Sequence, residues 1–362
     1  MQICQSTSLA EQALPTLPRP RGTISTYVID MVQAPAGPPA AGWLDDVDIA
    51  EALMGDDFHL ALYVLYELHY RSFADLDDGL EWNPHVLGVR AELERRFEDA
   101  LRSTTANGHC TDVVESLRDL VETSGGPSLS SYMANEGTVD DLREFAIHRS
   151  AYQLKEADPH TWALPRLHGR AKAALVTIQF DEYGLGVQSA MHSELFADTL
   201  RALGLDASYG AYVEQLPGVT LATVNLVSMF GLHRRLRGAL VGHLAVFEMT
   251  SVTPMQRYSN ALERMGVPLE ARRFYDVHVV ADEEHQVVAL HELAAGLVES
   301  EPGLGDDVMF GARAVLQVEA TFARHLLDSW SAGVSSLLSP EGDRRNGSVP
   351  TGGRDEVEAY DR

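Results

Sequence analysis

The sequence predicts an all-α protein. Apolar residues recur at the three- and four-residue spacing of helices through most of the 362 residues. No segment alternates polar and apolar residues for long enough to build a sheet. Helix-capping residues and breaker clusters separate the periodic segments, and no internal repeat is present. Hydrophobic residues make up 45% of the chain, which is enough to bury a substantial core.

The composition excludes several classes of function. Fifty-three acidic residues against 28 basic residues give a formal net charge of −25, which would repel nucleic-acid phosphates and anionic lipid surfaces. We therefore expect no nucleic-acid partner and no membrane partner. No apolar run approaches the length of a membrane span and no secretory signal pattern is present, so the expected location is cytoplasmic by default. Cys4 and Cys110 are too few for a disulfide framework.

The N-terminal part divides into a leader and a helical region. Residues 1–42 hold six prolines among small residues, so we expect a mostly irregular leader. Residues 43–130 are expected to form an N-terminal helical region. Its clearest segments are 57–70, which is apolar nearly all round as a buried helix is, and 82–101, which has an apolar stripe and an exposed charged face. His59 and His69 are expected to have core or capping roles.

The breaker cluster Ser124-Gly-Gly-Pro-Ser128 marks the expected boundary with a larger helical domain at 137–333. Caps, prolines and glycines place its expected helices at 138–157, 169–203, 218–230, 233–252, 255–265, 270–298 and 305–333. The polar residues 338–362 are expected to form a disordered tail.

The strongest candidate for chemistry is the segment from His278 to His285. Offsets of four and seven residues return close to the starting direction at about 100° per residue, so His278, Asp282 and His285 share one helix face. Two imidazoles and a carboxylate, with no thiolate, suit iron better than structural zinc. A solvated helix face with two chance histidines is the alternative for this pattern taken alone.

Glu248 is a second candidate, because it is a lone carboxylate in the apolar helix 233–252. Burial of a carboxylate without a partner is costly, which favours metal ligation. Pairing with Arg234 or Arg235 is the structural alternative.

Glu182 and His192 form the third candidate set. Ten residues separate them, which places their side chains about 80° apart on an ideal helix, so a local bulge is required to bring them together. Gly184 and Gly186 would permit such a distortion. The two glycines do not form a nucleotide-binding loop, because no strand precedes them.

Together these segments resemble the heme-oxygenase-like diiron oxidases and oxygenases. The resemblance rests on Lys155-Glu-Ala-Asp-Pro-His160, Asp181-Glu-Tyr-Gly184, His192-Ser-Glu-Leu-Phe196, Glu248 and the face of His278, Asp282 and His285. It covers about 137–333, and the 45–105 region is also similar to the N-terminal helices of actinobacterial members. The resemblance implies a heme-oxygenase-like helical bundle. It also implies metal-ligand roles for Glu182, His192, Glu248, His278, Asp282 and His285, and it suggests that Glu156 joins the iron site when a core helix rearranges.

The same resemblance implies a non-heme diiron oxidoreductase. Two Fe(II) ions would reduce O2, the co-substrate, to a bridging peroxide, and electrons would come from an external donor, either a reductase or a small reductant. No catalytic residue beyond the metal ligands is expected. Because the spacing is closest to that of N-oxygenating members, we expect N-oxygenation of an amine or guanidine-type small molecule in specialised metabolism.

Three further expectations stay open at this stage. The bundle also supports oxidative C–C cleavage or desaturation of an amino or fatty acid, for which Arg272 or Arg273 could anchor a carboxylate, unless they are only exposed charges beside Glu270. A non-catalytic helical binding protein is the alternative from another class. The apolar residues of the 57–70 helix exceed what one short helix can bury alone, so they pack on the larger domain or on a second copy, and we expect a homodimer.

Overall fold

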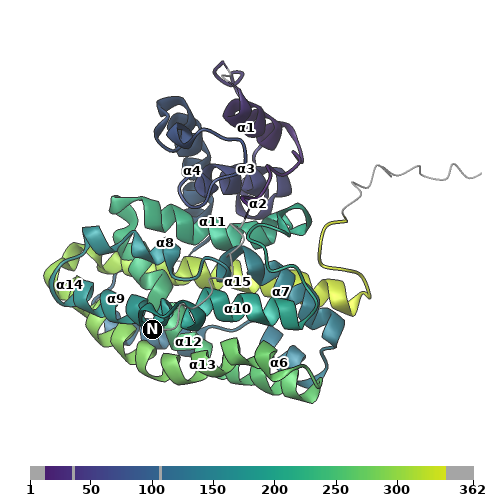
Figure 1. Ribbon diagram of the computed structural model, residues 1–362. Helices are drawn as coiled ribbons and strands as arrows, with labels where there is room; N and C mark the ends of the chain where they lie inside the picture. The colour runs from purple at the N-terminus through teal and green to yellow at the C-terminus, as the bar shows by residue number, and fades with distance from the viewer. Residues whose placement is uncertain (1–12, 35–36, 106–107, 340–362) are drawn as a thin grey trace, which may run out of the picture.

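The computed structural model describes residues 13–34, 37–105 and 108–339. Throughout these ranges the chain forms helices joined by turns, with no strand, which confirms the all-α expectation (Figure 1). None of the helices in the described ranges is both long and apolar enough to cross a membrane.

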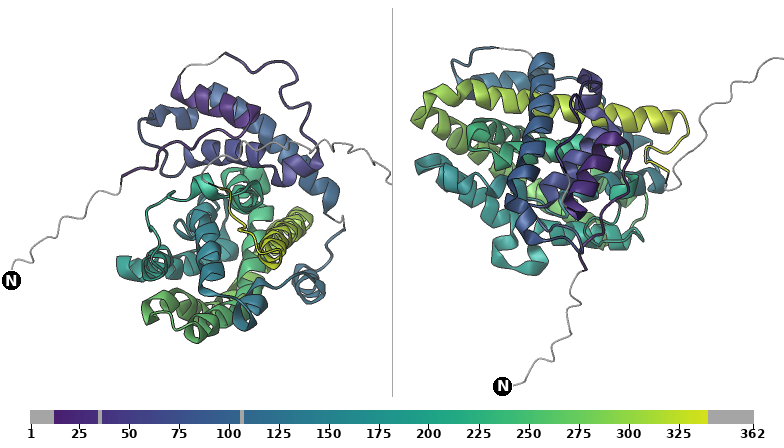
Figure 2. Two further views of the ribbon diagram at one scale, coloured as in Figure 1. Left: turned by 90° about the vertical axis from the view of Figure 1, so that its right-hand side faces the viewer. Right: turned by 90° about the horizontal axis from the view of Figure 1, so that it is seen from above.

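The N-terminal helices form a layer of their own on top of the bundle in Figure 1, and the views in Figure 2 show the same arrangement. This layer consists of α1 (Thr23–Gln33), α2 (Ile49–Met54), α3 (Asp56–Glu67) and α4 (Pro84–Thr104), with a short 3-10 turn at Asp78–Trp82 before α4. Two further helices, α5 (Val113–Thr123) and α6 (Leu129–Asn135), lead from this layer into the bundle, with the breaker cluster between them.

Helix α1 lies inside the segment that was expected to be an irregular leader. The prolines flank this helix and do not interrupt it. The Asp57 carboxylate of α3 accepts hydrogen bonds from the backbone amides of Ile24 (2.9 Å) and Ser25 (2.7 Å), so the first turn of α1 is capped by a residue distant in sequence. The apolar face of α1 is buried against α3. Residues 1–12 of the expected leader lie outside the described residues.

One hydrophobic core joins the N-terminal layer to the bundle. Residues 58–67 of α3 are all buried, and α3 packs against α11 (Gly218–Leu232), which is itself buried nearly all round. The core cluster that contains Val64 and Leu93 also contains Leu226 and Val315. The apolar residues of α3 are therefore covered within the chain, and their burial needs no second copy.

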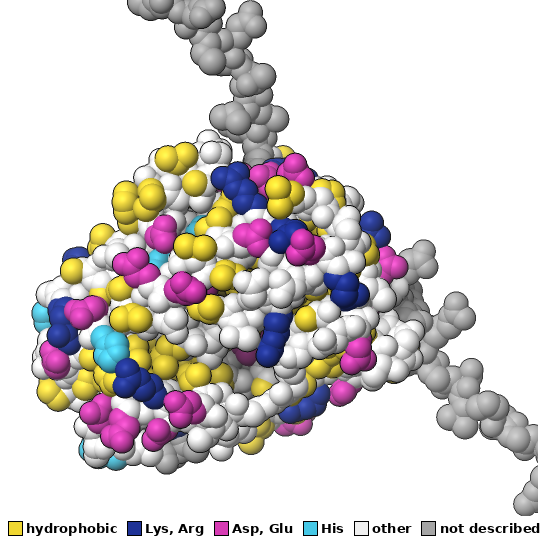
Figure 3. Space-filling model, turned by 90° about the horizontal axis from the view of Figure 1, so that it is seen from below, with side chains coloured by type: hydrophobic (Ala, Val, Ile, Leu, Met, Phe, Trp, Pro, Cys, Tyr) yellow, Lys and Arg dark blue, Asp and Glu magenta, His cyan; other side chains and the backbone are white. Residues whose placement is uncertain are grey.

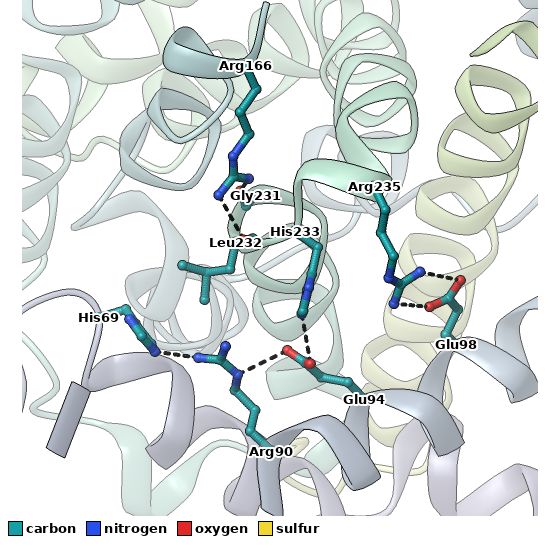
Figure 4. Close-up of polar contacts among 9 residues, drawn as sticks. All are labelled: His69, Arg90, Glu94, Glu98, Arg166, Gly231, Leu232, His233 and Arg235. Carbon is teal, nitrogen blue, oxygen red and sulfur yellow. Dashed lines mark hydrogen bonds and ion pairs between the residues drawn. The ribbon is translucent and has the colours of Figure 1, made fainter. Parts of the chain in front are cut away.

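Polar contacts fix helix α4 on the end of α11 (Figure 4). Glu94 of α4 lies 3.3 Å from the Arg90 guanidinium and 2.8 Å from Nε2 of His233. Glu98 accepts two hydrogen bonds from Arg235, at 3.0 and 2.6 Å. Arg166 donates to the last carbonyl groups of α11, at Gly231 and Leu232, where a cation is favourable. The two histidines of the 57–70 region have structural roles, because His59 contacts the Ala52 carbonyl and His69 contacts Glu81 and Arg90.

The bundle is built around helix α12 (Arg237–Arg264), which packs along α13 (Leu269–Val287) and α15 (Gly305–Ser331). The close approach of α12 and α15 depends on two glycines. A Cβ atom on Gly242 would lie 1.9 Å from the Val308 carbonyl oxygen, and one on Gly311 would lie 1.9 Å from the Ala239 carbonyl oxygen. The remaining helices of the bundle are α7 (Val139–Gln153), α8 (Asp158–Thr161), α9 (Gly169–Glu182), α10 (His192–Ala202) and α14 (Ala295–Ser300).

Three helix boundaries differ from expectation. The expected break near residue 253 is wrong, because α12 continues through Pro254; packing along α13 and α15 outweighs the one backbone hydrogen bond that proline removes. The expected helix 270–298 contains a π-helical turn at Val288–Ala294, which begins three residues after His285. The expected helix 169–203 is two helices, α9 and α10, separated by the loop from Tyr183 to Met191. Of the expected tail 338–362, all but Leu338 and Ser339 lies outside the described residues.

Candidate metal centre

The seven candidate ligands come from five parts of the bundle and meet in its interior. Glu156 lies in the turn after α7, Glu182 ends α9 and His192 begins α10. The others are Glu248 in the middle of α12 and His278, Asp282 and His285 on one face of α13. Each of the seven side chains is 10% exposed or less. The structure thus brings every sequence-predicted ligand to one place.

These residues lie where two hydrophobic clusters meet. On α12, Val246 belongs to one cluster and Tyr258 to the other, with Glu248 between them. On α13, Tyr275 belongs to the second cluster, and Ala289 just beyond the helix belongs to the first. The carboxylates and imidazoles therefore occupy a seam between two apolar regions, from which bulk water is largely excluded.

One group of potential ligands consists of Glu156, Glu182, His192 and His278. One nitrogen or oxygen atom from each of the four lies within 4.8 Å of the others. Nδ1 of His192 is 2.8 Å from Oε2 of Glu182, and Nε2 of His278 is 3.6 Å from Oε1 of Glu156. The rings of His192 and His278 lie side by side, with centroids 4.3 Å apart.

A second group consists of Glu182, Glu248 and His285. Nδ1 of His285 is 3.6 Å from Oε1 of Glu182, 3.5 Å from Oε2 of Glu248 and 3.6 Å from Oδ1 of Asp282. Glu182 belongs to both groups, and its two oxygens face different histidines, Oε2 toward His192 and Oε1 toward His285. This carboxylate therefore belongs to both groups of potential ligands and joins them.

The loop between α9 and α10 makes the contact between Glu182 and His192. Because α9 ends at Glu182, the two side chains are not constrained to the angle of one continuous helix, and no bulge is needed. Gly184 in this loop has φ +63°, and a Cβ atom there would lie 2.4 Å from the backbone of Ala190 and Met191. The sequence indicated a distortion at this glycine, but not that the helix ends there.

The outer nitrogen atoms of two histidines are held by groups behind the centre. Nδ1 of His278 donates a hydrogen bond of 2.8 Å to the Phe274 carbonyl, which leaves Nε2 facing Glu156. Nε2 of His285 lies 3.0 Å from Oδ2 of Asp181, which leaves Nδ1 facing the second group. This arrangement is common around metal-bound histidines, because it fixes the ring and its tautomer. Asp181 directly precedes Glu182 in the sequence, but no local pattern assigns it this role.

The electrostatic environment shifts the pKa values of the carboxylates in different directions. Burial raises the pKa of the Glu248 carboxyl to about 8, with Asp282 adding to the rise. Burial also acts to raise the pKa of Glu182, but His192 and His278 outweigh it and lower the pKa to about 2. Burial raises the pKa of Glu156. The buried carboxylates outnumber their cationic neighbours, and bound metal ions would compensate the remaining negative charge.

The pKa values of the two histidines of α13 are both raised. Burial acts to lower the pKa of His278, but Glu156 outweighs it and raises the pKa to about 10. Burial likewise opposes protonation of His285, whereas Asp282 and Glu248 raise its pKa to about 11. Both rings are thus surrounded by anionic oxygen, which favours a cation at the centre.

Unpartnered atoms show that the residues fit a metal. Oε2 of Glu156 and Nδ1 of His285 are buried without a hydrogen-bond partner, and the close neighbour of Nδ1 of His192 is the Glu182 carboxylate. Buried polar atoms of this kind are rare unless a ligand satisfies them. A nitrogen and oxygen donor set without sulfur suits a first-row metal such as iron. The alternative pairing of Glu248 with Arg235 does not occur, since Arg235 pairs with Glu98.

A cavity of about 470 Å³ opens beside the candidate ligands. Its lining includes Glu156, Glu182, Glu248, His278 and Asp282, the loop 124–128 and several Phe and Tyr side chains.

Arg149 of α7 and Glu319 of α15 form an ion pair on the wall of this cavity, with hydrogen bonds of 3.0 and 2.7 Å. Arg272 and Arg273, the arginines considered from the sequence as carboxylate anchors, do not border the cavity, and Arg272 contacts Glu263 at 3.3 Å. The expected helix 138–157 would place Arg149 and Glu156 seven residues apart on one face, but α7 ends at Gln153, so this register does not reach Glu156.

Comparisons with known proteins agree with this geometry. Residues 143–320 match the family model described as iron-containing redox enzyme. The chain is also 26% identical over 200 residues to a nitrosourea synthase from Streptomyces achromogenes subsp. streptozoticus. That alignment covers 54% of this chain and 42% of the relative, so the chain spans less than half the length of the curated protein it matches. The matched segment contains all seven candidate ligands, and residues 143–320 belong to the iron-containing redox enzymes with a heme-oxygenase-like fold.

Proposed function

We propose that this chain is a diiron oxygenase that binds two Fe(II) ions and oxygenates a nitrogen atom of an amine or guanidine-type small molecule in specialised metabolism. The observation that carries the proposal is the pair of ligand groups that share Glu182. A bridging carboxylate between two histidine and carboxylate groups is the arrangement expected of a two-metal site in a helical bundle. The relative supports the nitrogen target, because its name identifies a nitrosourea, which contains an N–O bond, as its product.

The chain would hold the metals through distinct groups. Glu156, His192 and His278 would bind one ion, Glu248, Asp282 and His285 the other, and Glu182 both. The bound ions would supply reduction of O2. The overall reaction places one oxygen atom on the substrate nitrogen and releases the other as water, which takes two electrons and two protons from an external donor, a reductase or a small reductant. The buried seam between the two clusters excludes water, and Asp181 and the Phe274 carbonyl hold the two histidine rings in position.

The acidity of the chain gives only weak support for a cationic substrate. On the face shown in Figure 3, acidic side chains are scattered among basic and hydrophobic ones and do not gather in one patch. On this face the acidic side chains therefore serve surface solvation. Within the cavity wall, Arg149 is already paired with Glu319.

A second candidate function is oxidative C–C cleavage or desaturation of an amino or fatty acid. One observation bears on it: Arg149 borders the cavity, and a substrate carboxylate could bind there by displacing Glu319 from the ion pair. A non-catalytic helical binding protein is disfavoured, because such a protein would retain several buried carboxylates without a compensating cation.

The metal centre is tested by anaerobic titration of the full chain with Fe(II). We expect two equivalents to bind, and we expect Glu182→Ala to weaken both because this carboxylate belongs to both groups. The matched control is Glu283→Ala, because Glu283 is an exposed acid on α13. This variant should bind iron as the wild type does. Wild-type protein that takes up no iron, or a control that loses as much affinity as Glu182→Ala, would contradict the proposal.

The reaction type is tested with the iron-loaded protein, isotopically labelled O2 and a chemical reductant. Amines and guanidines are offered in parallel with amino and fatty acids, and products are identified by mass spectrometry. We expect an N-hydroxy product that carries one labelled oxygen. An alkene or released CO2 without any N-oxygenated product would instead support the second candidate.

A further inference from the structure

The turn that carries Glu156 is anchored from both sides. It follows α7 and precedes the short α8, and its neighbouring side chains, those of Lys155 and Asp158, point to different elements. Lys155 forms an ion pair with Glu67 of α3, and each of these two side chains is only 1% exposed. The hydroxyl of Tyr209 donates a hydrogen bond of 2.6 Å to the other oxygen of Glu67. We call Glu67, Lys155 and Tyr209 the α3 clamp.

Aromatic rings enclose the ammonium group of the clamp. Nζ of Lys155 lies 4.1 Å from the ring centroid of Tyr70 and 5.3 Å from that of Tyr63. Rings at this distance attract a desolvated cation. A buried charge pair is strongly destabilised when it is pulled apart, because each partner would be left uncompensated. The clamp therefore sets the position of Lys155 relative to α3 within narrow limits.

The opposite side of the turn is tied to the end of α9. Oδ1 of Asp158 accepts a hydrogen bond of 2.8 Å from the hydroxyl of Tyr183, the residue directly after Glu182. Between the two anchors, Ala157 has φ +73°, a left-handed conformation that costs roughly 1 to 2 kcal/mol for a residue with a Cβ atom. Such a conformation persists only where surrounding contacts hold it.

Glu156 itself has few contacts that could fix its place. Its Oε1 is 3.6 Å from Nε2 of His278, beyond a good hydrogen bond, and its Oε2 has no partner. Its backbone amide makes a long bond of 3.3 Å to the Gln153 carbonyl. The position of this carboxylate at the candidate centre is thus set by its neighbours in the chain.

We propose that the α3 clamp is a positioning device for the metal centre, through which the N-terminal helical layer holds Glu156 in reach of one metal ion. This inference rests on the metal centre of the proposed function. Glu67, Lys155 and Tyr209 are not among the potential metal ligands, so they would act on the centre by positioning Glu156. It also makes the N-terminal layer a part of the oxygenase and not an appendage.

The test is anaerobic titration of the full chain with Fe(II), in which binding is measured by calorimetry. The clamp is replaced by apolar groups of similar size in the triple variant Glu67→Leu, Lys155→Met, Tyr209→Phe, which leaves no buried charge unpaired. We expect one iron equivalent to bind about 10- to 100-fold more weakly, as for loss of groups that orient metal ligands, and the other to bind as in the wild type. Tyr209→Phe alone, which keeps the ion pair, should give a smaller loss of affinity at the same equivalent.

The matched control is Glu98→Leu, Arg235→Met. This pair also joins the N-terminal layer to the bundle, but it has no contact with the turn that carries Glu156. We expect the control to bind both equivalents as the wild type does. If the triple variant retains wild-type affinity for both equivalents, or if the control loses as much affinity as the triple variant, the clamp has no positioning role. If the wild type binds no iron, the metal centre itself is contradicted.

The Tyr209→Phe variant keeps the test decisive if the triple variant fails to fold. It removes one hydroxyl group from a residue that packs beside the second hydrophobic cluster, so circular dichroism should show a native helical signal. Native folding with unchanged affinity for both iron equivalents would then overturn the proposal.

Discussion

Asp181 is the residue whose role can be tested with least disturbance to the fold. Its carboxylate lies 3.0 Å from Nε2 of His285 while 39% of its side chain is exposed, so its loss leaves no buried group without a partner other than that ring nitrogen. Without Asp181 the His285 ring can rotate and exchange tautomers. We expect Asp181→Ala to weaken the binding of one iron equivalent by about 10- to 100-fold, measured by anaerobic titration.

Asp198→Ala serves as the control for Asp181→Ala. Asp198 is an exposed acid on α10 that pairs with Arg201 at 2.6 Å, away from the candidate ligands. Its loss should change neither iron affinity nor helical content. Equal affinities for Asp181→Ala and Asp198→Ala would show that Asp181 does not orient His285.

At the scale of single residues, the sequence predicts the candidate metal ligands better than the residues that hold those ligands in position. His278, Asp282 and His285 could be found because helical geometry places them on one face, and Glu248 because a lone acid interrupts an apolar helix. Asp181 and Lys155 could not be assigned, because their partners His285 and Glu67 are about 90 to 100 residues away and no local pattern joins them. Pairing over such distances depends on the tertiary fold.

Among the elements, the α9–α10 loop differs from what the local sequence pattern predicts. Periodicity favoured one helix over 169–203, and the glycines were read as a bulge within it. The structure instead ends α9 at Glu182 and starts α10 at His192. Similarly, α1 was missed because its N-terminal cap is Asp57 of another helix, which the sequence around α1 does not reveal. In α1 a contact distant in sequence holds the start of the helix, whereas after α9 a close backbone approach between Gly184 and the Ala190–Met191 segment shapes the loop.

Gly184→Ala tests that loop. Its positive φ costs about 1 kcal/mol for alanine, and the added Cβ would also clash with the backbone of Ala190 and Met191. Gly186 has φ +81° with no atom within 4 Å of an added Cβ, so Gly186→Ala carries the conformational cost without the clash. We expect Gly184→Ala to lower the free energy of urea unfolding by at least about 2 kcal/mol more than Gly186→Ala does, and to weaken iron binding. Equal losses in the two variants would contradict this account of the loop.

At the scale of the whole molecule, buried histidines outside the ligand set make the fold less stable in acid. Burial lowers the pKa of His59 and of His148 to about 3, that of His160 to about 4, and that of His243 well below its ordinary value. Unfolded histidine titrates near pH 6.5. At these histidines, between about pH 6 and 4, the unfolded chain therefore binds protons that the folded chain does not, so their contribution makes stability fall as the pH falls. His278 and His285, whose pKa values are raised, are protonated in both states over this range and add no slope.

His59 offers the cleanest measurement of this effect. Its Nε2 lies 3.1 Å from the Ala52 carbonyl, and its Nδ1 lies 3.2 Å from the Asn225 amide, an arrangement that fits a neutral ring. Each such histidine should contribute about 1.4 kcal/mol of lost stability per pH unit below about pH 6. In His59→Gln the slope of the unfolding free energy against pH, taken from urea titrations of the metal-free protein, should fall by about one proton. His109→Gln, in which an exposed ring is replaced, should keep the wild-type slope. An unchanged slope in His59→Gln would mean that His59 takes up its proton within the fold, and that the core around α3 and α11 admits the charge.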